Sequence, residues 1–468
     1  MPEKYHIKTT YIKPRLPRIG KYGVVDWRED CARCHNCVKK ACVYDKYREE
    51  STFIRDIDEV HALYYECMGC FSCIQNCTKN LLMISVNSEY KKLGNNYWTP
   101  QIFSTLWLEA ETGKVPVSGA GYRGKFSGHG FDSMWTDMSE IVRPTRDGIH
   151  GREYINTSVD IGRKLSYLSF QEEQLASSLP PVISLPFPVI FDMPSVNHTL
   201  PQLYPYVLET AKQTGLISII SSEQWNALKT VNKETYLDHI AFHLEPGAPD
   251  IPENLINRTR LVEITDGKDV VNHANRLKES APHIVVAVRV PLDKNGPSRV
   301  EQLLRSGIDT FHLTADINGD EIGTDSPRFI KDVIREIHGT LIKNEKRDEI
   351  TLIAGGGIAL AEHVAKALIC GADLVSINVP LMIAVECRLC EACKPGDYCP
   401  AKLDRELDIS YGAGRMINLI GAWYWQMVEL MGAMGMREAR RLRGDVGRAM
   451  FKNELEEEIY GPIFRKQG

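Results

Sequence analysis

Twelve of the thirteen cysteines in this 468-residue chain fall into three short groups, and their spacing limits the possible folds more than any other feature. The first group reads C-x2-C-x2-C-x4-C, and the second reads C-x2-C-x2-C-x3-C. Three thiolates at such short spacing can reach adjacent corners of one small iron–sulfur cube. The three groups are Cys31, Cys34, Cys37 and Cys42; Cys67, Cys70, Cys73 and Cys77; and Cys387, Cys390, Cys393 and Cys399. We therefore predict iron–sulfur clusters and electron transfer.

The first two groups are spaced like those of a two-cluster bacterial ferredoxin. In such modules the fourth cysteine of each run crosses to the other cluster, so Cys77 is predicted to join the first cluster and Cys42 the second. Short predicted strands at residues 24–27 and 82–86 flank the two runs. Two zinc sites are the alternative, but C-x2-C-x2-C with a trailing cysteine is a poor tetrahedral zinc pattern. We predict two 4Fe-4S clusters in this region.

The composition is that of an ordinary globular chain. The net charge is -5, and no long basic block suggests nucleic acid as a partner. The N-terminus lacks the apolar core of a signal peptide, and no segment offers about 18 uninterrupted apolar residues. Residues 416–436 come closest, but Gln426, Glu429 and several glycines interrupt them, which predicts a packed helix rather than a membrane span. Cysteines at ligand spacing indicate a reducing compartment, so we predict a cytoplasmic protein.

From residue 188 onward, short β-branched runs alternate with amphipathic stretches, which predicts a parallel α/β architecture. Eight such runs are enough to close a (β/α)8 TIM barrel, whose chemistry lies at the C-terminal ends of its strands. The predicted strands are 189–192, 216–220, 239–244, 261–264, 284–290, 310–314, 350–354 and 373–377. Predicted helices between them include 268–278, 300–304, 330–342 and 360–368.

Four regions follow from these patterns. Residues 22–90 are predicted to form a small ferredoxin-like α+β domain, and residues 91–180 an irregular segment that docks onto the barrel. Residues 181–385 form the barrel, and residues 386–468 a third cluster loop with C-terminal helices that complete the barrel.

Glycines and polar residues gather at the predicted strand ends. Gly355–Gly357 follow the seventh strand and Ser376 ends the eighth, where phosphate-binding barrels present backbone N–H groups to an anion. A simple turn is the alternative for the glycines, but their place favours an FMN phosphate. Arg289 interrupts an apolar strand, so it must either pair with a carboxylate or face a ligand such as a flavin. The predicted cofactor-binding residues are Met193, Pro194, Ser195, Asn197, Arg289, Asp316, Gly319, Gly323, Thr324, Gly355, Gly356, Gly357, Ser376 and Asn378.

Together these motifs resemble the FMN-binding synthase domain of glutamate synthase, especially the archaeal type, in which a two-cluster ferredoxin precedes the barrel. The resemblance covers about residues 25–450 and includes Gly323–Thr324, the Gly355–Gly357 turn and Val379–Leu381. It implies FMN in the barrel and an iron–sulfur cluster beside it.

The resemblance also bears on the third cysteine group. In that family three cysteines hold a 3Fe-4S cluster, and Cys387, Cys393 and Cys399 match their positions. Cys390 supplies a further thiolate, and four thiolates complete a 4Fe-4S cube. We favour 4Fe-4S for this third cluster and keep 3Fe-4S as the alternative.

The sequence departs from that family where its substrate binds. The family carries a lysine-containing segment after strand four that helps to position 2-oxoglutarate, whereas here this strand ends Thr265-Asp266-Gly267. The family's flavin-contacting lysine on strand five is replaced by Arg289. We therefore predict no specific catalytic residue.

We expect a glutamate synthase-like oxidoreductase that passes electrons between FMN and three iron–sulfur clusters, as a subunit of an anaerobic hetero-oligomeric complex. One alternative is a glutamate synthase subunit that makes L-glutamate from 2-oxoglutarate and ammonia or glutamine. Another is a non-catalytic electron-transfer adaptor. No GxGxxG fingerprint follows a strand, so reaction with NAD(P)H would need a partner, such as a flavin/NAD(P)H or ferredoxin-linked subunit.

Overall fold

The structure is a computed structural model, and it describes residues 5–17, 19–25, 34, 43, 69–115, 128–136, 154–171, 174–175, 179–192, 203–228, 232–247, 251–390, 399–403 and 408–464. The chain divides into two compact units, each built from separate stretches of sequence. The larger contains Met1–Ile12, Leu108–Val385 and Lys402–Gly468, and the smaller contains Lys13–Trp107 and Glu386–Ala401. The predicted domains are continuous in sequence, and their boundaries stay predictions.

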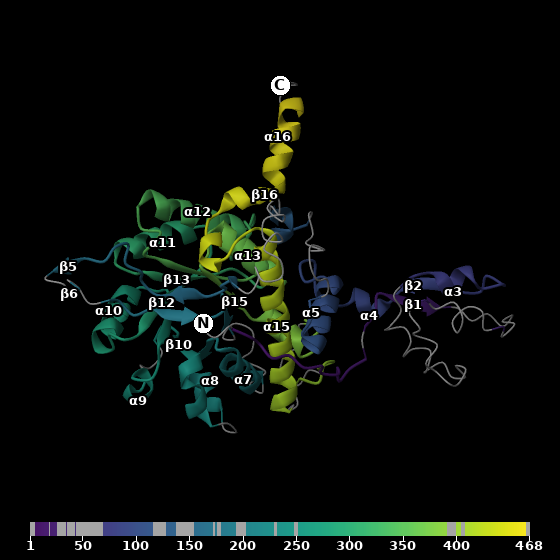
Figure 1. Cartoon of the computed structure of the whole chain (residues 1–468), viewed down its shortest axis with the longest axis horizontal. Helices are drawn as coiled ribbons and strands as arrows, with labels where there is room; N and C mark the ends of the chain where they lie inside the picture. Colours follow the sequence, from purple (N-terminus) through teal and green to yellow (C-terminus); the bar gives the residue numbers. More distant parts are fainter. Residues whose placement is uncertain are drawn as a thin grey trace. The chain divides into compact units, whose positions relative to one another are not determined.

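The larger unit is built on a closed barrel of eight parallel strands within the described residues, with helices around it (Figure 1). Consecutive strands are neighbours, and the last strand pairs with the first. The strands are β8 (Val189–Asp192), β9 (Ser218–Ser221), β10 (Ile240–Leu244), β11 (Leu261–Thr265), β12 (Val285–Pro291), β13 (Thr310–Thr314), β14 (Thr351–Gly355) and β15 (Leu374–Ile377). The predicted TIM barrel is confirmed, and each predicted strand is present to within two residues at either end.

The strands are continuous buried runs because helices cover the outside of the barrel. In β12 every residue from Val285 to Val290 is buried, without the alternation of a half-exposed strand. Four predicted helices are also confirmed, as α10 (Val270–Ser280), α11 (Gly296–Arg305), α12 (Ile330–Lys343) and α13 (Ala361–Cys370). Further helices near the barrel are α7 (Tyr204–Thr214), α8 (Ser222–Ala227), α9 (Glu253–Ile256) and α14 (Val379–Ala384).

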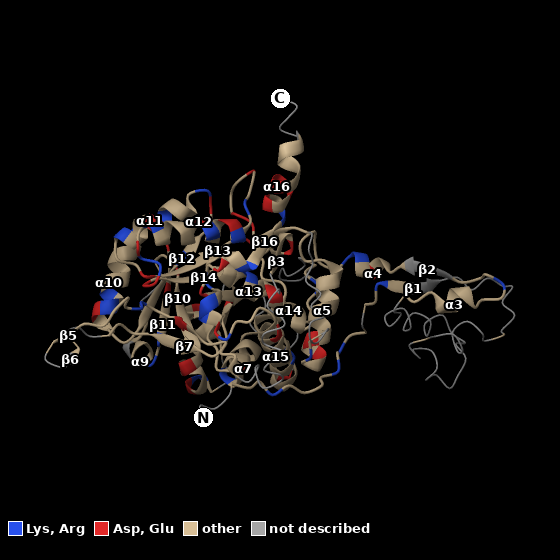
Figure 2. Cartoon of the chain, turned by 45° about the horizontal axis from the view of Figure 1, so that its top comes forward, with Lys and Arg blue, Asp and Glu red and all other residues tan. Residues whose placement is uncertain are grey.

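The long helix α15 (Ile409–Ala433) contains most of the segment predicted to be a packed helix, and it is buried along much of its length. Gly412 lets α15 approach α7 closely, because a Cβ there would lie 2.5 Å from the ring of Tyr206. None of the described helices is long and apolar enough to cross a membrane. Both basic and acidic residues lie on the outer helices, as Figure 2 shows for α10 and α12.

Short antiparallel pairs complete the larger unit. They are β3 (Met134–Thr136) with β16 (Ala449–Phe451), β4 (Val159–Ile161) with β7 (Ile183–Leu185), and β5 (Phe170–Gln171) with β6 (Gln174–Leu175). The last helix is α16 (Lys452–Phe464).

The smaller unit contains the flanking strands predicted for the ferredoxin-like region. β1 (Tyr22–Val25) pairs antiparallel with β2 (Met83–Val86), although residues 26 and 27 of the first predicted strand lie outside the described residues. The remaining helices that begin in this unit are α3 (Ser72–Gln75), α4 (Ser88–Lys91) and α5 (Pro100–Thr112).

Candidate functional site

The barrel interior contains a buried carboxylate that accepts three strong hydrogen bonds. Glu263, on β11, is 1% exposed. One of its oxygens, Oε2, accepts from Nδ1 of His243 at 2.6 Å and from Nε of Arg289 at 2.7 Å. The other, Oε1, accepts from Nδ1 of His312 at 2.5 Å. Hydrogen bonds from several donors are what make a buried carboxylate tolerable in an apolar interior.

Arg289 also crosses the barrel to a second carboxylate. Its Nη2 donates to Oδ1 of Asp192 at 2.7 Å, and β8, which carries Asp192, lies on the opposite side of the barrel from β12. Of the two possibilities for Arg289, pairing with a carboxylate is therefore the one observed. Its predicted contact with the flavin stays a prediction.

Three further side chains extend these contacts. Nε2 of His312 lies 2.7 Å from Oγ of Ser376, on β15. Nε2 of His243 lies 3.0 Å from Oε1 of Glu245 and 3.1 Å from Oγ1 of Thr265. We use the name barrel network for six buried residues, namely Asp192, His243, Glu263, Arg289, His312 and Ser376.

The charges in the barrel network shift the pKa values of Glu263 and His243. Burial alone would raise the pKa of Glu263, but Arg289 and His312 lower it well below its usual range. Burial alone would lower the pKa of His243, but the hydrogen bond and charge of Glu263 raise it above the ordinary value. Glu263 is therefore a carboxylate at neutral pH, and His243 favours its cationic form.

Gly355, one of the predicted phosphate-binding glycines, leaves room for the contact between Ser376 and His312. A Cβ on Gly355 would lie 2.4 Å from Oγ of Ser376 and 2.9 Å from Nε2 of His312. Gly355 ends β14, so this contact lies near the strand ends where the sequence predicts a cofactor. Of the predicted cofactor-binding residues, Ser376 and Arg289 both belong to the barrel network, and Gly355 lies against Ser376.

The two predicted cofactor loops after β13 and β14 touch each other. Gly357 has a φ of +68°, and a Cβ on it would lie 2.8 Å from Cα of Gly319. Asp316 shapes the first loop, because its Oδ1 accepts from the backbone N of Asn318 at 2.9 Å and of Asp320 at 2.8 Å. Such tight backbone packing is the kind that lets main-chain N–H groups approach an anion.

The other described residues of the predicted cofactor site have local roles. Gly356 has a φ of +104° in the turn after β14, and Gly323 has a φ of +69° in the loop before α12. Oγ1 of Thr324 accepts from the backbone N of Ser326 at 3.4 Å. The side chain of Asn378 caps α14 by accepting from the backbone N of Val379 at 2.5 Å. Met193, Pro194, Ser195 and Asn197 lie outside the described residues.

Seven of the twelve predicted cluster ligands are described, and none of the seven forms a disulfide. These are Cys34, Cys70, Cys73, Cys77, Cys387, Cys390 and Cys399. The others, Cys31, Cys37, Cys42, Cys67 and Cys393, lie outside the described residues. Within the described parts of the chain, no three His, Cys, Asp or Glu side chains are grouped as a metal site.

Backbone geometry at two of these cysteines suits thiolate ligands. The backbone N of Leu81 donates to Sγ of Cys77 at 3.3 Å, and this hydrogen bond lowers the pKa of the Cys77 thiol. The backbone N of Leu389 likewise donates to Sγ of Cys387 at 3.5 Å. Hydrogen bonds to sulfur stabilise the thiolate, which is the form that binds iron.

The first two cysteine runs also approach each other. Sγ of Cys34 lies 3.8 Å from Oγ1 of Thr78, the residue after Cys77. Gly69 has a φ of +67°, and a Cβ there would lie 2.4 Å from the ring of Tyr22. The chain between Cys67 and Cys70 therefore needs glycine at this position.

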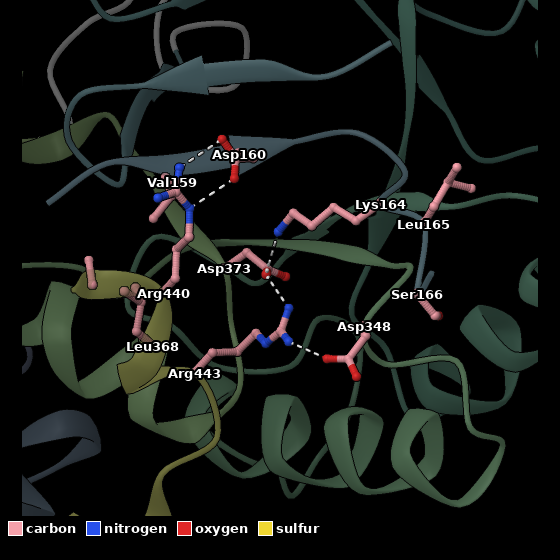
Figure 3. A pocket seen from close by; sticks show the side chains of 11 residues that line it. Val159, Asp160, Lys164, Leu165, Ser166, Asp348, Leu368, Asp373, Arg440 and Arg443 are labelled. Carbon is pink, nitrogen blue, oxygen red and sulfur yellow. Dashed lines mark hydrogen bonds and ion pairs between the residues drawn. The ribbon is translucent and has the colours of Figure 1, made fainter. Parts of the chain in front are cut away.

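A cavity of about 310 Å³ lies at the other end of the barrel, beside the start of β15 (Figure 3). Arg443 donates to Asp373 at 3.2 Å and to Asp348 at 2.6 Å, and Arg440 pairs with Asp160 at 2.8 Å. Its arginines are thus already neutralised by carboxylates. The N-terminal face of such barrels serves stability rather than chemistry, and we assign this cavity no function.

His243, Glu263 and His312 were not predicted as site residues. Each is a polar residue inside an otherwise apolar strand, which is the signal that singled out Arg289. The same argument about the cost of burying a polar group applies to all of them and could have found them.

Comparison with known proteins identifies the relatives of this chain. Residues 253–437 match the family model described as "Conserved region in glutamate synthase". This range begins before β11 and extends past α15, so it includes Glu263, Arg289, His312 and Ser376.

Several curated relatives extend the similarity along the chain. An archaeal-type glutamate synthase (NADPH) of Dehalococcoides mccartyi is 23% identical, over 90% of this chain and 93% of the relative. An archaeal glutamate synthase (NADPH) of Archaeoglobus fulgidus is 24% identical, over 90% and 92%. One of Methanocaldococcus jannaschii is 25% identical, over 94% and 97%. The resemblance predicted from the motifs is confirmed.

Proposed function

Taking this chain as a glutamate synthase-like oxidoreductase, we propose that it passes electrons between FMN in the barrel and three iron–sulfur clusters. We further propose that it works as one subunit of a larger redox complex. The proposal rests on two contacts at neighbouring strand ends. Gly355 lies against Ser376, and Gly357 lies against Gly319. The barrel that holds them carries the region matched by the glutamate synthase family model.

The residues at these strand ends fit an FMN phosphate. The turn of Gly356 and Gly357 has positive φ angles and no side chains, so backbone N–H groups can approach an anion. Ser376 would offer a hydroxyl, and the loop shaped by Asp316 would border the ligand. FMN, when bound there, supplies exchange between two-electron and one-electron steps.

The cysteine groups fit iron–sulfur clusters by their spacing, and the N–H···S contacts of Cys77 and Cys387 support thiolate ligands. We propose 4Fe-4S clusters for the first two groups. For the third group we propose 4Fe-4S, with 3Fe-4S as the alternative.

Synthesis of glutamate is the second candidate function, and the names of the relatives favour it. The region after β11 opposes it, because Asp266 stands where the family has its substrate lysines. The carboxylate of Asp266 is held by Arg299, with oxygens 2.8 Å from Nε and 2.7 Å from Nη2. Arg299 is neutralised by this pair, so it does not replace the cations that the family uses to position 2-oxoglutarate. An adaptor that turns over no small molecule is the remaining alternative.

The test starts from protein purified without oxygen and assayed for iron, sulfide and FMN. About twelve irons and one FMN per chain are expected from three four-iron clusters and one flavin. The reduced flavin is then followed by absorbance while 2-oxoglutarate and ammonia or glutamine are added. Reoxidation with glutamate formed would support the second candidate, whereas reoxidation only by a partner protein would support the first. Protein without FMN would refute both.

A further inference from the structure

The third cysteine group is bordered by an ion pair whose carboxylate is buried. Glu386 precedes Cys387, the first predicted ligand, and it is 4% exposed. Oε2 of Glu386 accepts from Nε of Arg15 at 3.1 Å. Its Oε1 accepts from the backbone N of Arg15 at 3.0 Å and from the backbone N of Leu16 at 3.1 Å. A buried carboxylate needs such donors, and these three come from one short segment far away in the sequence.

The same guanidinium also reaches the far end of the cysteine group. Nη2 of Arg15 donates to the backbone O of Ala401 at 3.0 Å, and Ala401 lies two residues after Cys399, the last predicted ligand. One side chain therefore joins the two ends of the segment 386–401. We use the name loop clamp for Arg15, Glu386 and the backbone O of Ala401. All three belong to the smaller unit.

Two residues at the start of this segment have an unfavourable backbone conformation. Glu386 has a φ of +74° and Leu389 has a φ of +47°, in the left-handed region that residues with side chains rarely adopt. Such conformations persist where surrounding contacts hold them. Arg15 holds Glu386, and the backbone N of Leu389 donates to Sγ of Cys387. The bend therefore directs a backbone N–H to the first predicted ligand.

Left-handed residues are concentrated beside the predicted cluster ligands. In the described parts of the chain, six residues other than glycine have a positive φ, and five of them lie within three residues of a predicted ligand. The five are Phe71, Asn80, Glu386, Leu389 and Lys402, and the sixth is Glu345. Backbone strain of this kind gathers at ligand-binding sites. The bend at Glu386 is therefore part of the ligand geometry rather than an ordinary surface turn.

We propose that Arg15 is a positioning residue for the third iron–sulfur cluster. The loop clamp joins the ends of the segment 386–401 before iron binds, so Cys387 and Cys399 lose less chain entropy when they bind the cluster. Arg15 binds no iron and acts through Glu386 and the backbone of the loop. This role rests on the proposed function, because it requires the third cluster.

Arginine suits the loop clamp because its planar fork offers several donors in fixed directions. Nε faces Glu386 while Nη2 faces Ala401. Lysine keeps the positive charge, but its single nitrogen cannot stand at both places. Arg15→Lys therefore keeps a charge for Glu386 and opens the clamp, whereas Arg15→Gln also removes the charge.

The experiment follows iron release to a chelator from the complete protein, purified without oxygen. Electron paramagnetic resonance of the oxidised and reduced protein monitors the clusters, and Cys387→Ala identifies the signal of the third. In Arg15→Gln this signal should disappear about 10–100-fold faster than in the unaltered protein, as when a group that orients metal ligands is removed. Arg15→Lys should give an intermediate rate. The signals of the first two clusters should keep their rates in both variants.

The matched control is Arg163→Gln, which removes a partly exposed pair with Glu349 in the larger unit and should change no rate. An unchanged rate for the third cluster in Arg15→Gln would overturn the positioning role. Equally faster release from all three clusters would also overturn it, because a general loss of stability would then explain the result.

Hydrogen exchange separates failure of the loop clamp from failure of the proposed function. Unaltered protein with only about eight irons and no third signal would refute the third cluster, and the positioning role with it. The clamp itself is measured without iron, because the amides of Arg15 and Leu16 donate to Glu386 and should be protected. Glu386→Ala should remove that protection. Amides that exchange equally fast in both proteins would overturn the clamp, whatever the iron content.

Discussion

At the residue scale, Glu263 is the single side chain on which most of the barrel interior depends. Its two oxygens satisfy Arg289, His243 and His312, and none of these three donors reaches water freely, since all are at most 8% exposed. Removing one partner from a buried ion pair leaves the other charge uncompensated, which costs more than the pair itself contributed.

We therefore expect Glu263→Gln to lower the free energy of unfolding by about 3–5 kcal/mol, because Arg289 keeps only one carboxylate. Denaturant titration measures this change. The matched control is Glu301→Gln, which removes an exposed pair with Arg305 four residues along α11. That change should cost no more than about 0.5 kcal/mol. Equal costs for the two variants would contradict the central role of Glu263.

The buried carboxylate at the other end of the barrel gives a pH-dependent prediction. Burial alone would raise the pKa of Asp373, but Arg347, Lys164 and Arg443 lower it to about 2. A carboxylate whose pKa is lower in the folded than in the unfolded state adds stability above the unfolded pKa. That stability, on the order of 2 kcal/mol, is lost as the pH falls from about 4 to about 2.

Asp373→Asn should remove this part of the pH dependence. We expect the free energy of unfolding of the variant to change less between pH 4 and pH 2 than that of the unaltered chain. Hydrogen exchange of the β14 and β15 amides follows the change locally, because Oδ2 of Asp373 accepts from the backbone N of Leu352. Asp325→Asn, at an exposed loop position, should keep the original profile.

At the element scale, the turn after β14 and the loop after β13 depend on two glycines. Gly357 has a φ of +68°, and a Cβ there would collide with Gly319 and with the carbonyl oxygen of Asn318 at 2.9 Å. Both the backbone conformation and the contact therefore require glycine.

Gly357→Ala should cost about 1–3 kcal/mol and separate the two loops. If FMN binds there, the purified variant should also contain less of it. Gly339→Ala is the control, because Gly339 lies within α12 and a Cβ on it would meet nothing within 4 Å. The control should be stabilised by about 0.5–1 kcal/mol. Gly357→Ala with unchanged stability would show that the turn tolerates a side chain.

At the scale of the whole molecule, the two compact units draw stability from different sources. The barrel buries a large apolar core, with strands covered on both faces. The smaller unit has a two-stranded sheet and short helices among its described elements. A small unit with little core needs metal ligation or another cross-link to be stable.

If the proposed clusters are bound, removal of their iron should affect the two units unequally. After treatment with a chelator under reducing conditions, we expect faster hydrogen exchange in β1, β2 and α3, while the barrel strands β8–β15 stay protected. Rebuilding the clusters with iron and sulfide should reverse the change. Equal loss of protection in the barrel would show that the clusters stabilise the chain as a whole.

Much of the fold was predictable because its signals are local. The buried run of β12 and the apolar face of α12 are short patterns that a single pass along the chain detects. The cysteine runs are equally local, since three predicted ligands of one cluster lie within a few residues. The division into units was less predictable, because the smaller unit joins Lys13–Trp107 to the distant segment Glu386–Ala401.

The eight strands, their order and the glycines at their ends could be predicted from the chain, because β-branched runs and positive-φ turns are properties of neighbouring residues. Which polar side chains meet inside the barrel depends instead on how the strands close in space. Arg289 reaches Asp192 from the opposite side, and Glu263 reaches His312 across an intervening strand. Those contacts depend on closure of the sheet and on its register, which hydrogen bonds between strands distant in sequence establish.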